Sequence, residues 1–291
     1  MSTNRELFIK TKRNDEKRRG VHLNETEIYS LLIAANGFAD YTELIIHFDD
    51  EIKNFEEFDR NLNRIYTGEP LQYILGKTTF VDLDILVDHN VLIPRPETEG
   101  LAILIKDYIN MYNIEHGTIA DVCTGSGCIA LYLKKQFSDS TVYASDKYED
   151  PLLVAERNKE KLNLDIKLLK GSRLQPFEER NIRIDVLVSN PPYVSETKDI
   201  DENVLNHEPL TAIYSHVGTH FYDSYFRHYK DVMGEKFMMA FEIGYDQKED
   251  LLNLIKRYFD VEKIQYLFKK DMYGKDRYLL IFGGYHLENL E

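Results

Sequence analysis

A regular alternation of strand-like and helix-like segments from residue 118 onward is the feature that most constrains the fold of this chain. Apolar stretches at 118–122, 141–145, 165–170, 184–189 and 237–243 are typical of strands. Helices are expected from Gly127, at about 150–163 and after Asp246 as a cap. This order predicts an α/β fold with a mostly parallel sheet and helices on both faces. Two further stretches, 261–268 and 277–282, can pair as a hairpin across 272–275, so one edge is expected to be antiparallel.

The segment before this region predicts a small helical bundle at 21–68, after a frayed or weakly helical start at 1–20. Asn24 and Glu27 have the spacing of a capping box, and Gly37 is a plausible helix end. Asp40 is expected to cap a second helix. The apolar faces of the three helices are expected at Ile28, Leu31, Leu32 and Ala35, then Leu44, Ile45 and Phe48, then Phe55, Phe58, Leu62 and Ile65.

Residues 70–95 differ in pattern and predict a β-hairpin. Apolar residues at Val81, Leu83, Ile85 and Val87 alternate with aspartates, as in a strand with one wet face. Pro96 suits the first turn of a following helix. The chain is therefore expected to divide into a helical domain at 1–70, a hairpin linker at 71–95 and an α/β domain at 96–291.

Composition excludes several classes of protein. Hydrophobic residues make up 43% and charged residues 30% of the 291 positions, which is typical of globular domains. No apolar run approaches the roughly 18 residues that a membrane span needs, and the polar N-terminus does not resemble a secretory signal. Two cysteines cannot make a disulfide framework or a four-ligand zinc site, so we expect no metal site and a reducing cytoplasm.

Charge argues against a nucleic-acid partner. The net charge is −14, whereas proteins that bind duplexes usually carry a basic footprint. The charge is unevenly distributed, since residues 21–75 hold eleven Asp or Glu against three Lys or Arg. This acidic stretch could attract a basic protein partner, although charge alone favours the simpler interpretation of a solvated helical surface.

The segment 121–128 (DVCTGSGC) follows a strand and opens a helix. Gly125 and Gly127 let the backbone approach a ligand closely. Asp146 ends the next strand, 21 residues after Gly125, where a carboxylate can accept both hydroxyl groups of a ribose. These features indicate an adenosine site. Ala130 replaces the third glycine of the dinucleotide motif, which makes a dinucleotide less fitting, and a tight turn without a ligand remains an alternative.

The segment 189–193 (SNPPY) directly follows another strand. Two prolines end that strand and remove two N–H donors, so the carbonyl groups there can only accept. With the side-chain oxygen of Asn190, they could accept both hydrogens of a planar NH₂ group while Tyr193 stacks on its face. A proline-rich turn without a ligand is the alternative.

Acceptors of this kind suit transfer to an amide nitrogen, which is a poor nucleophile because its lone pair is delocalised. They orient the NH₂ group and stabilise the positive charge that develops on nitrogen. A sulfonium methyl group is an electrophile that needs no strong general base. Together with the adenosine site, the pattern therefore indicates S-adenosylmethionine rather than a nicotinamide.

The motifs GEPLQYILG, VLIPRPETE, DVCTGSGCIAL, SNPPY and FEIGYDQ occur in this order within residues 65–282. The series resembles the release-factor glutamine methyltransferase family, whose members are protein-(glutamine-N5) methyltransferases. NPPY alone is shared with DNA adenine methyltransferases, whereas its combination with IPRPETE is more specific. The resemblance implies a seven-stranded Rossmann-like methyltransferase sheet with an antiparallel last strand, plus a small N-terminal helical bundle that binds the substrate.

The resemblance also implies an activity and a site. S-adenosylmethionine would donate a methyl group to the GGQ glutamine of peptide-chain release factors, in a cytoplasmic monomer without nucleic-acid or membrane partners. The cofactor would be held by Cys123, Thr124, Gly125, Ser126, Gly127, Asp146, Arg173 and Asn190. The glutamine would be held by Asn190, Pro191, Pro192, Tyr193, Arg95 and Glu99, with Asn190, Pro191 and Tyr193 acting in catalysis. Glu97 and Glu99 are equally explained as acidic residues that suit a helix N-terminus.

Several positions depart from the family pattern. Cys123 replaces the usual glycine, which is tolerable if φ there is negative. Gly171-Ser172-Arg173 stands where the family usually has an acidic residue near the adenine. Residues 213–222 replace a glycine-rich stretch and are expected to alter a lid or the substrate groove, and His207 and His216 are expected at the surface.

These departures and the shared acceptor chemistry leave other functions open. The same acceptors would fit the exocyclic NH₂ group of adenine in nucleic acid, although such enzymes extrude the base and the charge opposes binding. A glutamine of a ribosomal protein is another possible target. A catalytically weakened homologue that only binds is the third alternative.

Overall fold

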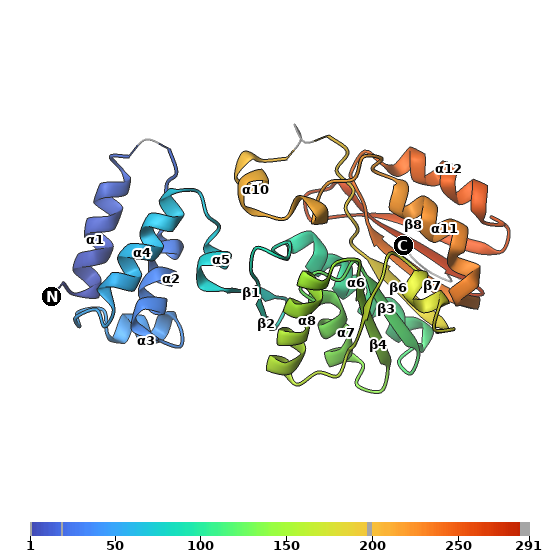
Figure 1. Cartoon of the computed structure of the whole chain (residues 1–291), viewed down its shortest axis with the longest axis horizontal. Coiled ribbons are helices and arrows are strands. Elements are labelled where there is room, and N and C mark those ends of the chain that lie inside the picture. The colour runs from blue at the N-terminus through green and yellow to red at the C-terminus, as the bar shows by residue number, and fades with distance from the viewer. Residues whose placement is uncertain (1, 19, 197–199, 286–291) are drawn as a thin grey trace. The chain divides into compact units, whose positions relative to one another are not determined.

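The computed structural model describes residues 2–18, 20–196 and 200–285, and the chain forms two compact units, Met1–Gly76 and Lys77–Glu291 (Figure 1). The division into 1–70, 71–95 and 96–291 expected from sequence stays a prediction. Within the described residues, no helix combines the length and the apolar character needed to cross a membrane.

The first unit is helical. Its helices are α1 (Asn4–Asp15), α2 (Glu25–Asn36), α3 (Tyr41–Ile46), α4 (Phe55–Tyr66) and α5 (Leu71–Leu75). The capping box at Asn24 and Glu27 is confirmed, as are the cap at Asp40 and the left-handed end at Gly37. The core contains Ile28, Leu31, Leu32, Ala35, Leu44, Phe58 and Ile65.

Two expectations for this unit are wrong. The start of the chain is not frayed, because Thr3 and Glu6 form a second capping box that begins a regular 12-residue α1. Leu7 on this helix is buried in the core of the unit. Two residues expected on the apolar faces are not core residues: Phe55 is the first residue of α4 and is 48% exposed, and Ile45 on α3 is 45% exposed.

The second unit begins with the expected hairpin, formed by the antiparallel strands β1 (Lys77–Phe80) and β2 (Leu83–Leu86). Phe80 pairs with Leu83, so Val81 lies in the two-residue turn, with φ 54°, and not in the strand as expected. The pairing thus moves the buried position from Val81 to Phe80, which is completely buried.

A seven-stranded sheet forms the centre of this unit. Its strands are β3 (Thr118–Val122), β4 (Thr141–Asp146), β5 (Lys167–Lys170), β6 (Ile184–Ser189), β7 (Met233–Glu242), β8 (Ile264–Lys270) and β9 (Asp276–Gly283). Their order is β5-β4-β3-β6-β7-β9-β8. The five strands β3 to β7 are parallel, and β9 is antiparallel to both of its neighbours. The expected fold with an antiparallel last strand is confirmed.

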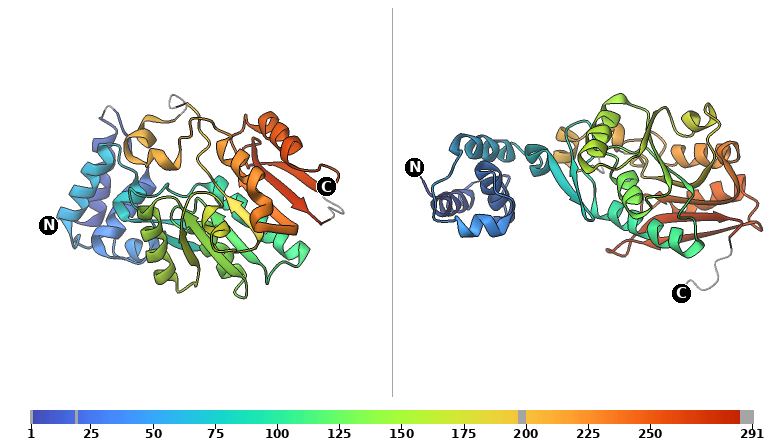
Figure 2. Two further views of the ribbon diagram at one scale, coloured as in Figure 1. Left: turned by 45° about the vertical axis from the view of Figure 1, so that its right-hand side comes forward. Right: turned by 90° about the horizontal axis from the view of Figure 1, so that it is seen from below.

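Helices cover both faces of the sheet (Figure 2). The helices of this unit are α6 (Pro96–Tyr112), α7 (Cys128–Gln136), α8 (Glu149–Leu162), α9 (Gln175–Glu178), α10 (Glu202–His207), α11 (His220–Val232) and α12 (Lys248–Tyr258), with a 3-10 turn at Leu210–Ala212. Helix α10 has no buried residue and lies away from the sheet (Figure 1). Successive strand residues point to opposite faces. Phe282 accordingly packs against Tyr108 of α6, whereas Phe241 on the other face packs against Phe226 of α11.

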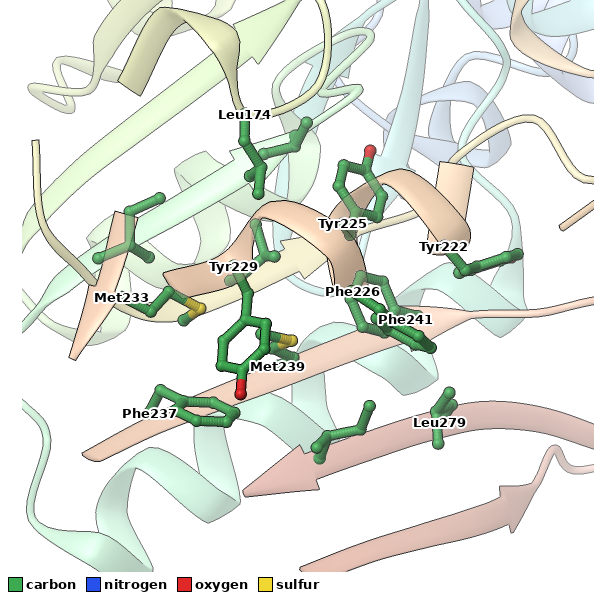
Figure 3. Packing of buried hydrophobic residues seen from close by; sticks show 14 of the residues in the cluster. Leu174, Tyr222, Tyr225, Phe226, Tyr229, Met233, Phe237, Met239, Phe241 and Leu279 are labelled. Atoms are coloured by element: carbon green, nitrogen blue, oxygen red, sulfur yellow. The ribbon is translucent and has the colours of Figure 1, made fainter. Parts of the chain in front are cut away.

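Helix α11 was missed by the sequence analysis, and it supplies much of the core on its face (Figure 3). Its buried side chains recur at helical spacing at Tyr222, Tyr225, Phe226 and Tyr229. Part of the divergent stretch 213–222 therefore belongs to a core helix. The expected cap of α12 is also wrong: Gln247 occupies the N-cap position without a side-chain cap bond, so Asp246 lies one residue too early.

We predict that Phe226→Ala destabilises the second unit by about 3–5 kcal/mol. The Phe226 side chain is 1% exposed, and its ring packs against Phe241 and Phe259, so truncation leaves a cavity. Hydrogen exchange of β7 amides measures this change in one unit. The exposed neighbour on the same helix, His228→Ala, should change stability by no more than about 0.5 kcal/mol, and equal effects of the two variants would contradict the packing role.

Candidate active site

Loops that follow the parallel strands meet at the carboxyl edge of the sheet, where ligands bind in open α/β folds. They surround a cavity of about 760 Å³. Eight of the predicted site residues line it, namely Cys123, Thr124, Gly125, Ser126, Asp146, Arg173, Asn190 and Pro192. Gly127 is not among the lining residues and forms the N-cap of α7.

The two glycines of the first loop serve different purposes. Gly125 has φ 55°, and a Cβ added there would meet nothing within 4 Å. Glycine is therefore favoured at this position by its left-handed backbone and not by lack of space. Gly127 also has positive φ, but a Cβ there would lie 3.1 Å from the Cβ of Ala155 on α8. Gly127 therefore also allows the loop to pack closely on the neighbouring helix.

Cys123 has φ 64°, so the condition of a negative φ is not met. A left-handed backbone costs a non-glycine residue about 1–2 kcal/mol, and the surrounding fold must hold it there. Its Sγ lies 3.6 Å from the hydroxyl of Tyr225. Burial raises the pKa of the Cys123 thiol to about 12, so the thiol is neutral at physiological pH and is a packing group, not a nucleophile.

Asp146 lies at the end of β4 with its carboxylate at the cavity wall. Its Oδ2 accepts from the N–H of Gly125 at 3.2 Å and its Oδ1 from the N–H of Tyr148 at 3.1 Å. Burial raises the pKa of Asp146, and these backbone donors oppose that effect. Each oxygen keeps a lone pair, so the carboxylate can still accept a pair of hydroxyl groups.

Arg173 reaches the cavity from the loop after β5, with φ 55°. It is hydrogen bonded to Nε2 of His220, and its guanidinium carbon lies 5.4 Å from the centre of the Phe221 ring. Its buried Nε has no partner within the described ranges. His220 and Phe221 were missed from sequence because they begin the unpredicted helix α11.

A second cavity of about 130 Å³ lies beside the first. Arg95, Pro191 and Tyr193 line it, and Leu92, Asn190 and Ala212 line both cavities. The structure therefore brings the Asn-Pro-Pro-Tyr segment to the junction of the two cavities. Pro192 faces the larger cavity, while Pro191 and Tyr193 face the smaller one.

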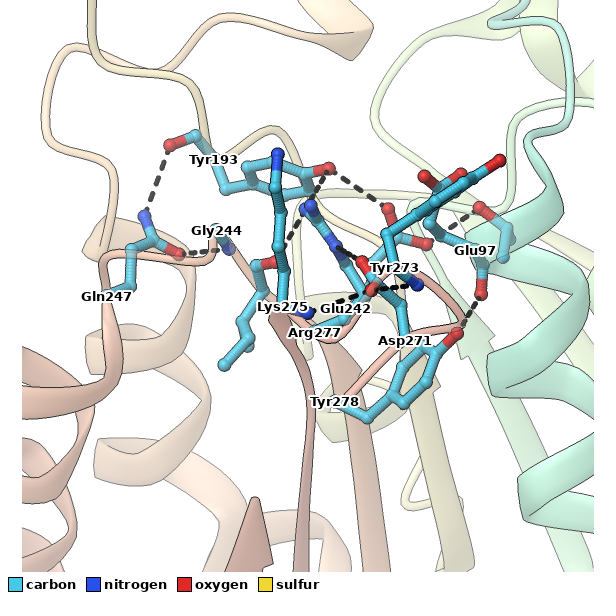
Figure 4. A network of polar contacts seen from close by, with 12 residues as sticks. Glu97, Tyr193, Glu242, Gly244, Gln247, Asp271, Tyr273, Lys275, Arg277 and Tyr278 are labelled. Atoms are coloured by element: carbon cyan, nitrogen blue, oxygen red, sulfur yellow. Dashed lines mark hydrogen bonds and ion pairs between the residues drawn. The ribbon is translucent and has the colours of Figure 1, made fainter. Parts of the chain in front are cut away.

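Asn190 and Tyr193 are held by groups that sequence reasoning did not assign. The Nδ2 of Asn190 donates to Thr98 Oγ1 at 3.0 Å. Thr98 donates in turn to Glu242 at 2.7 Å, and the Tyr193 hydroxyl donates to the other oxygen of Glu242 at 3.0 Å. Figure 4 shows this carboxylate among its partners. Thr98 lies in the motif IPRPETE and Glu242 in the motif FEIGYDQ, so the sequence signal that could have identified them is their place in these motifs.

The remaining candidate residues lie in different places. Arg95 lines the smaller cavity and pairs with the buried carboxylate of Glu208. Glu99 accepts from the N–H of Val81 at 3.0 Å and is not among the residues that line either cavity. His207 is half-buried, and His216 is exposed at the rim of the larger cavity.

No metal ligands were assigned from sequence. Among the described residues, one group of three potential ligands comes together, formed by Glu178, His228 and Asp231. None of these residues lines either cavity.

Two family models match the chain. Residues 17–76 match the PrmC N-terminal domain, and residues 98–208 match the Methyltransferase small domain. A crystal structure described as a proposed methyltransferase complexed with SAH has a TM-score of 0.50 at 9% identity and covers 69% of this chain and 53% of its own, which supports the fold alone. The family match at residues 98–208 thus identifies a methyltransferase domain in the second unit, and the helical first unit precedes it in the chain.

Curated relatives are more specific. The release factor glutamine methyltransferase of Bacillus subtilis is 37% identical over 79% of this chain and 80% of its own length. That of Staphylococcus aureus is 35% identical over 81% of this chain and 84% of its own. The chain belongs to the release factor glutamine methyltransferase family, which confirms the resemblance.

Asp121 lies near the end of β3 and supports the glycine-containing loop at residues 123–127. This completely buried side chain accepts from the Thr124 hydroxyl and from the N–H of Ala130 at 3.2 Å. Burial raises its pKa to about 7, although the hydrogen bonds from Thr124 and Ala130 favour the charged form.

This pKa predicts a pH-dependent cost. In the unfolded chain an aspartate titrates near 3.9, so between about pH 4 and 7 the folded state keeps a proton that the unfolded state has lost. Asp121 therefore lowers stability as pH rises through that window. We expect the stability of Asp121→Asn relative to wild type to rise by about 1.4 kcal/mol per pH unit between pH 5 and pH 7 and to level off above pH 7, as measured by urea unfolding of the second unit.

The control for this prediction is Glu149→Gln. The hydrogen bond from Lys170 lowers the pKa of Glu149, so its contribution is lost only as pH falls below about 4.5. This variant should keep the wild-type pH profile between pH 5 and pH 8. An Asp121→Asn profile parallel to wild type over that range would exclude a raised pKa.

Proposed function

We propose that this chain, as a cytoplasmic monomer, transfers a methyl group from S-adenosylmethionine to the side-chain amide nitrogen of the GGQ glutamine of peptide-chain release factors. The names of the relatives in its family support this substrate. The observation that carries the proposal is that Asn190 lines both cavities. One side chain can thus contact a bound cofactor and a bound carboxamide.

The larger cavity fits S-adenosylmethionine. Asp146 has free acceptor capacity for the ribose hydroxyl groups, and the left-handed loop at Gly125 opens space beside it. Arg173 and Phe221 offer flat surfaces at the side of the cavity where Gly171 and Ser172 also lie. When bound there, the cofactor supplies an electrophilic sulfonium methyl group.

The smaller cavity fits a primary carboxamide. The Oδ1 of Asn190 has no hydrogen-bond partner among the residues that the structure describes. Pro191 has a backbone carbonyl group that can accept a hydrogen bond, and its ring nitrogen carries no hydrogen to donate. These two oxygens would accept the hydrogens of the glutamine NH₂ group. They would hold its nitrogen toward the larger cavity and stabilise the positive charge that nitrogen gains.

Among the described residues that line the smaller cavity, none offers a free general base. Both oxygens of Glu242 already accept hydrogen bonds, and Arg95 is paired with Glu208. The Cys123 thiol is neutral because its pKa is raised to about 12. Orientation and charge stabilisation by Asn190 and Pro191 are therefore the contributions that these residues can make.

We also propose that the helical unit recognises the protein substrate. Residues 17–76 match the PrmC N-terminal domain, and the stretch 21–75 carries the surplus of acidic residues. An acidic helical surface suits a basic region of a protein partner.

We predict that the purified chain transfers labelled methyl from S-adenosylmethionine to a release factor but not to its GGA variant. Asn190→Ala should lower kcat by about 100-fold or more, because it removes one of the two acceptors that position the NH₂ group. Mass spectrometry of the GGQ peptide and incorporation of label measure both effects.

Asn253→Ala is the matched control for this experiment. Asn253 is an exposed asparagine on α12, so its truncation should leave kcat unchanged. Unaltered turnover by Asn190→Ala, or equal methylation of the GGA variant, would refute the proposed function.

A further inference from the structure

The buried carboxylate of Glu242 contacts Tyr193 of the Asn-Pro-Pro-Tyr segment and takes no direct part in the proposed reaction. Glu242 ends β7, and its side chain is 3% exposed. Its oxygens accept from Thr98 at 2.7 Å and from Tyr193 at 3.0 Å. Burial raises the pKa of Glu242, whereas these hydrogen bonds and the positive charge of Arg277 favour its carboxylate form. Burying a charged group costs free energy unless the group is paired. The buried position of this carboxylate therefore indicates a specific role.

A carboxylate fixes the direction of every hydrogen bond around it, because it can only accept. The single hydroxyl hydrogen of Thr98 is therefore used by Glu242. Thr98 Oγ1 is left as an acceptor, and it accepts from Asn190 Nδ2 at 3.0 Å. The NH₂ end of the Asn190 carboxamide is thereby drawn to Thr98, and the oxygen end is left for the cavities.

Both ends of this chain of hydrogen bonds are fixed by other elements. The hydroxyl of Tyr278 on β9 donates to the carbonyl of Glu97 at 2.9 Å, next to Thr98 at the start of α6. On the other side, Arg277 donates to the Tyr193 hydroxyl at 3.3 Å and to Asp271 at 3.2 Å (Figure 4). The Tyr193 hydroxyl hydrogen is consequently directed at Glu242.

We propose that Glu242 is a positioning residue that acts through Thr98 to hold the Asn190 carboxamide with Oδ1 toward the substrate. The inference rests on the proposed function, because it explains how the acceptor for a glutamine NH₂ group is kept in the productive orientation. A flipped carboxamide would present its own NH₂ group to that of the substrate. Two donors would then face each other, and the site would reject a glutamine side chain.

Substitution of the two relay residues tests the proposal. Thr98→Val keeps the shape but removes the hydroxyl group, and Glu242→Gln offers a donor that can reverse the relay. Each should lower kcat for methylation of a release factor by about 10- to 100-fold. Thr98→Ser keeps the hydroxyl group and should stay within about three-fold of wild type.

The double variant distinguishes a relay from separate structural roles. If both residues act by the same link, Thr98→Val with Glu242→Gln should be no more than about three-fold slower than the slower single variant. Losses that multiply would overturn the relay. Calorimetric titration of Glu242→Gln with S-adenosylmethionine should give a dissociation constant within about three-fold of wild type, because Glu242 lines the smaller cavity and not the larger one. A merely unfolded site would lose this binding as well.

The outcomes separate the two proposals. Wild-type methylation of the GGQ glutamine with equal kcat for Thr98→Val and Thr98→Ser would overturn the relay alone. Absence of wild-type methylation would overturn the proposed function and the relay with it. If Glu242→Gln fails to fold, the Val and Ser variants at position 98 still decide the question.

Discussion

The abrupt end of β6 at Asn190-Pro191-Pro192 is the constraint on which the site depends. Parallel pairing with β3 and β7 carries this strand to the centre of the sheet, and the prolines then prevent its continuation. The backbone must leave the sheet at the edge where the loops after β3, β4 and β5 also emerge. Asn190 and Asp146 thereby line one cavity without any loop having to reach across the fold.

Side chains at this point are oriented by buried and partly buried polar groups that hydrogen bond to one another. Asn190, Thr98, Glu242 and Tyr193 form a continuous series, and the series continues through Arg277. Because Thr98 and Glu242 are buried and have few alternative partners, the network specifies side-chain orientation as well as position. The site therefore depends on residues from α6, β7 and β9 in addition to the loops that line it.

Much of the fold and the visible part of the site could be predicted from sequence, because their signals are local. The strands carry apolar runs, and Gly125, Asp146 and Asn190 stand at strand ends. The network could not be predicted, because Thr98 and Glu242 are 144 residues apart and meet only in the folded sheet. The left-handed backbone of Cys123 could not be predicted either, because a cysteine, unlike a glycine, does not indicate a positive φ. Helix α11 was missed although Tyr222, Tyr225, Phe226 and Tyr229 carried its period.

The insertion of β9 between β7 and β8 has a consequence for biosynthesis. A ribosome delivers β9 after every other strand of this sheet, and domains begin to form while the chain is still being made. Until β9 arrives, β7 is an open strand edge, and neither Arg277 nor Tyr278 is present to complete the polar network. A nascent chain would thus form the loop at residues 123–127 before the polar network around Asn190 is complete, so that this network is finished in the last step of assembly.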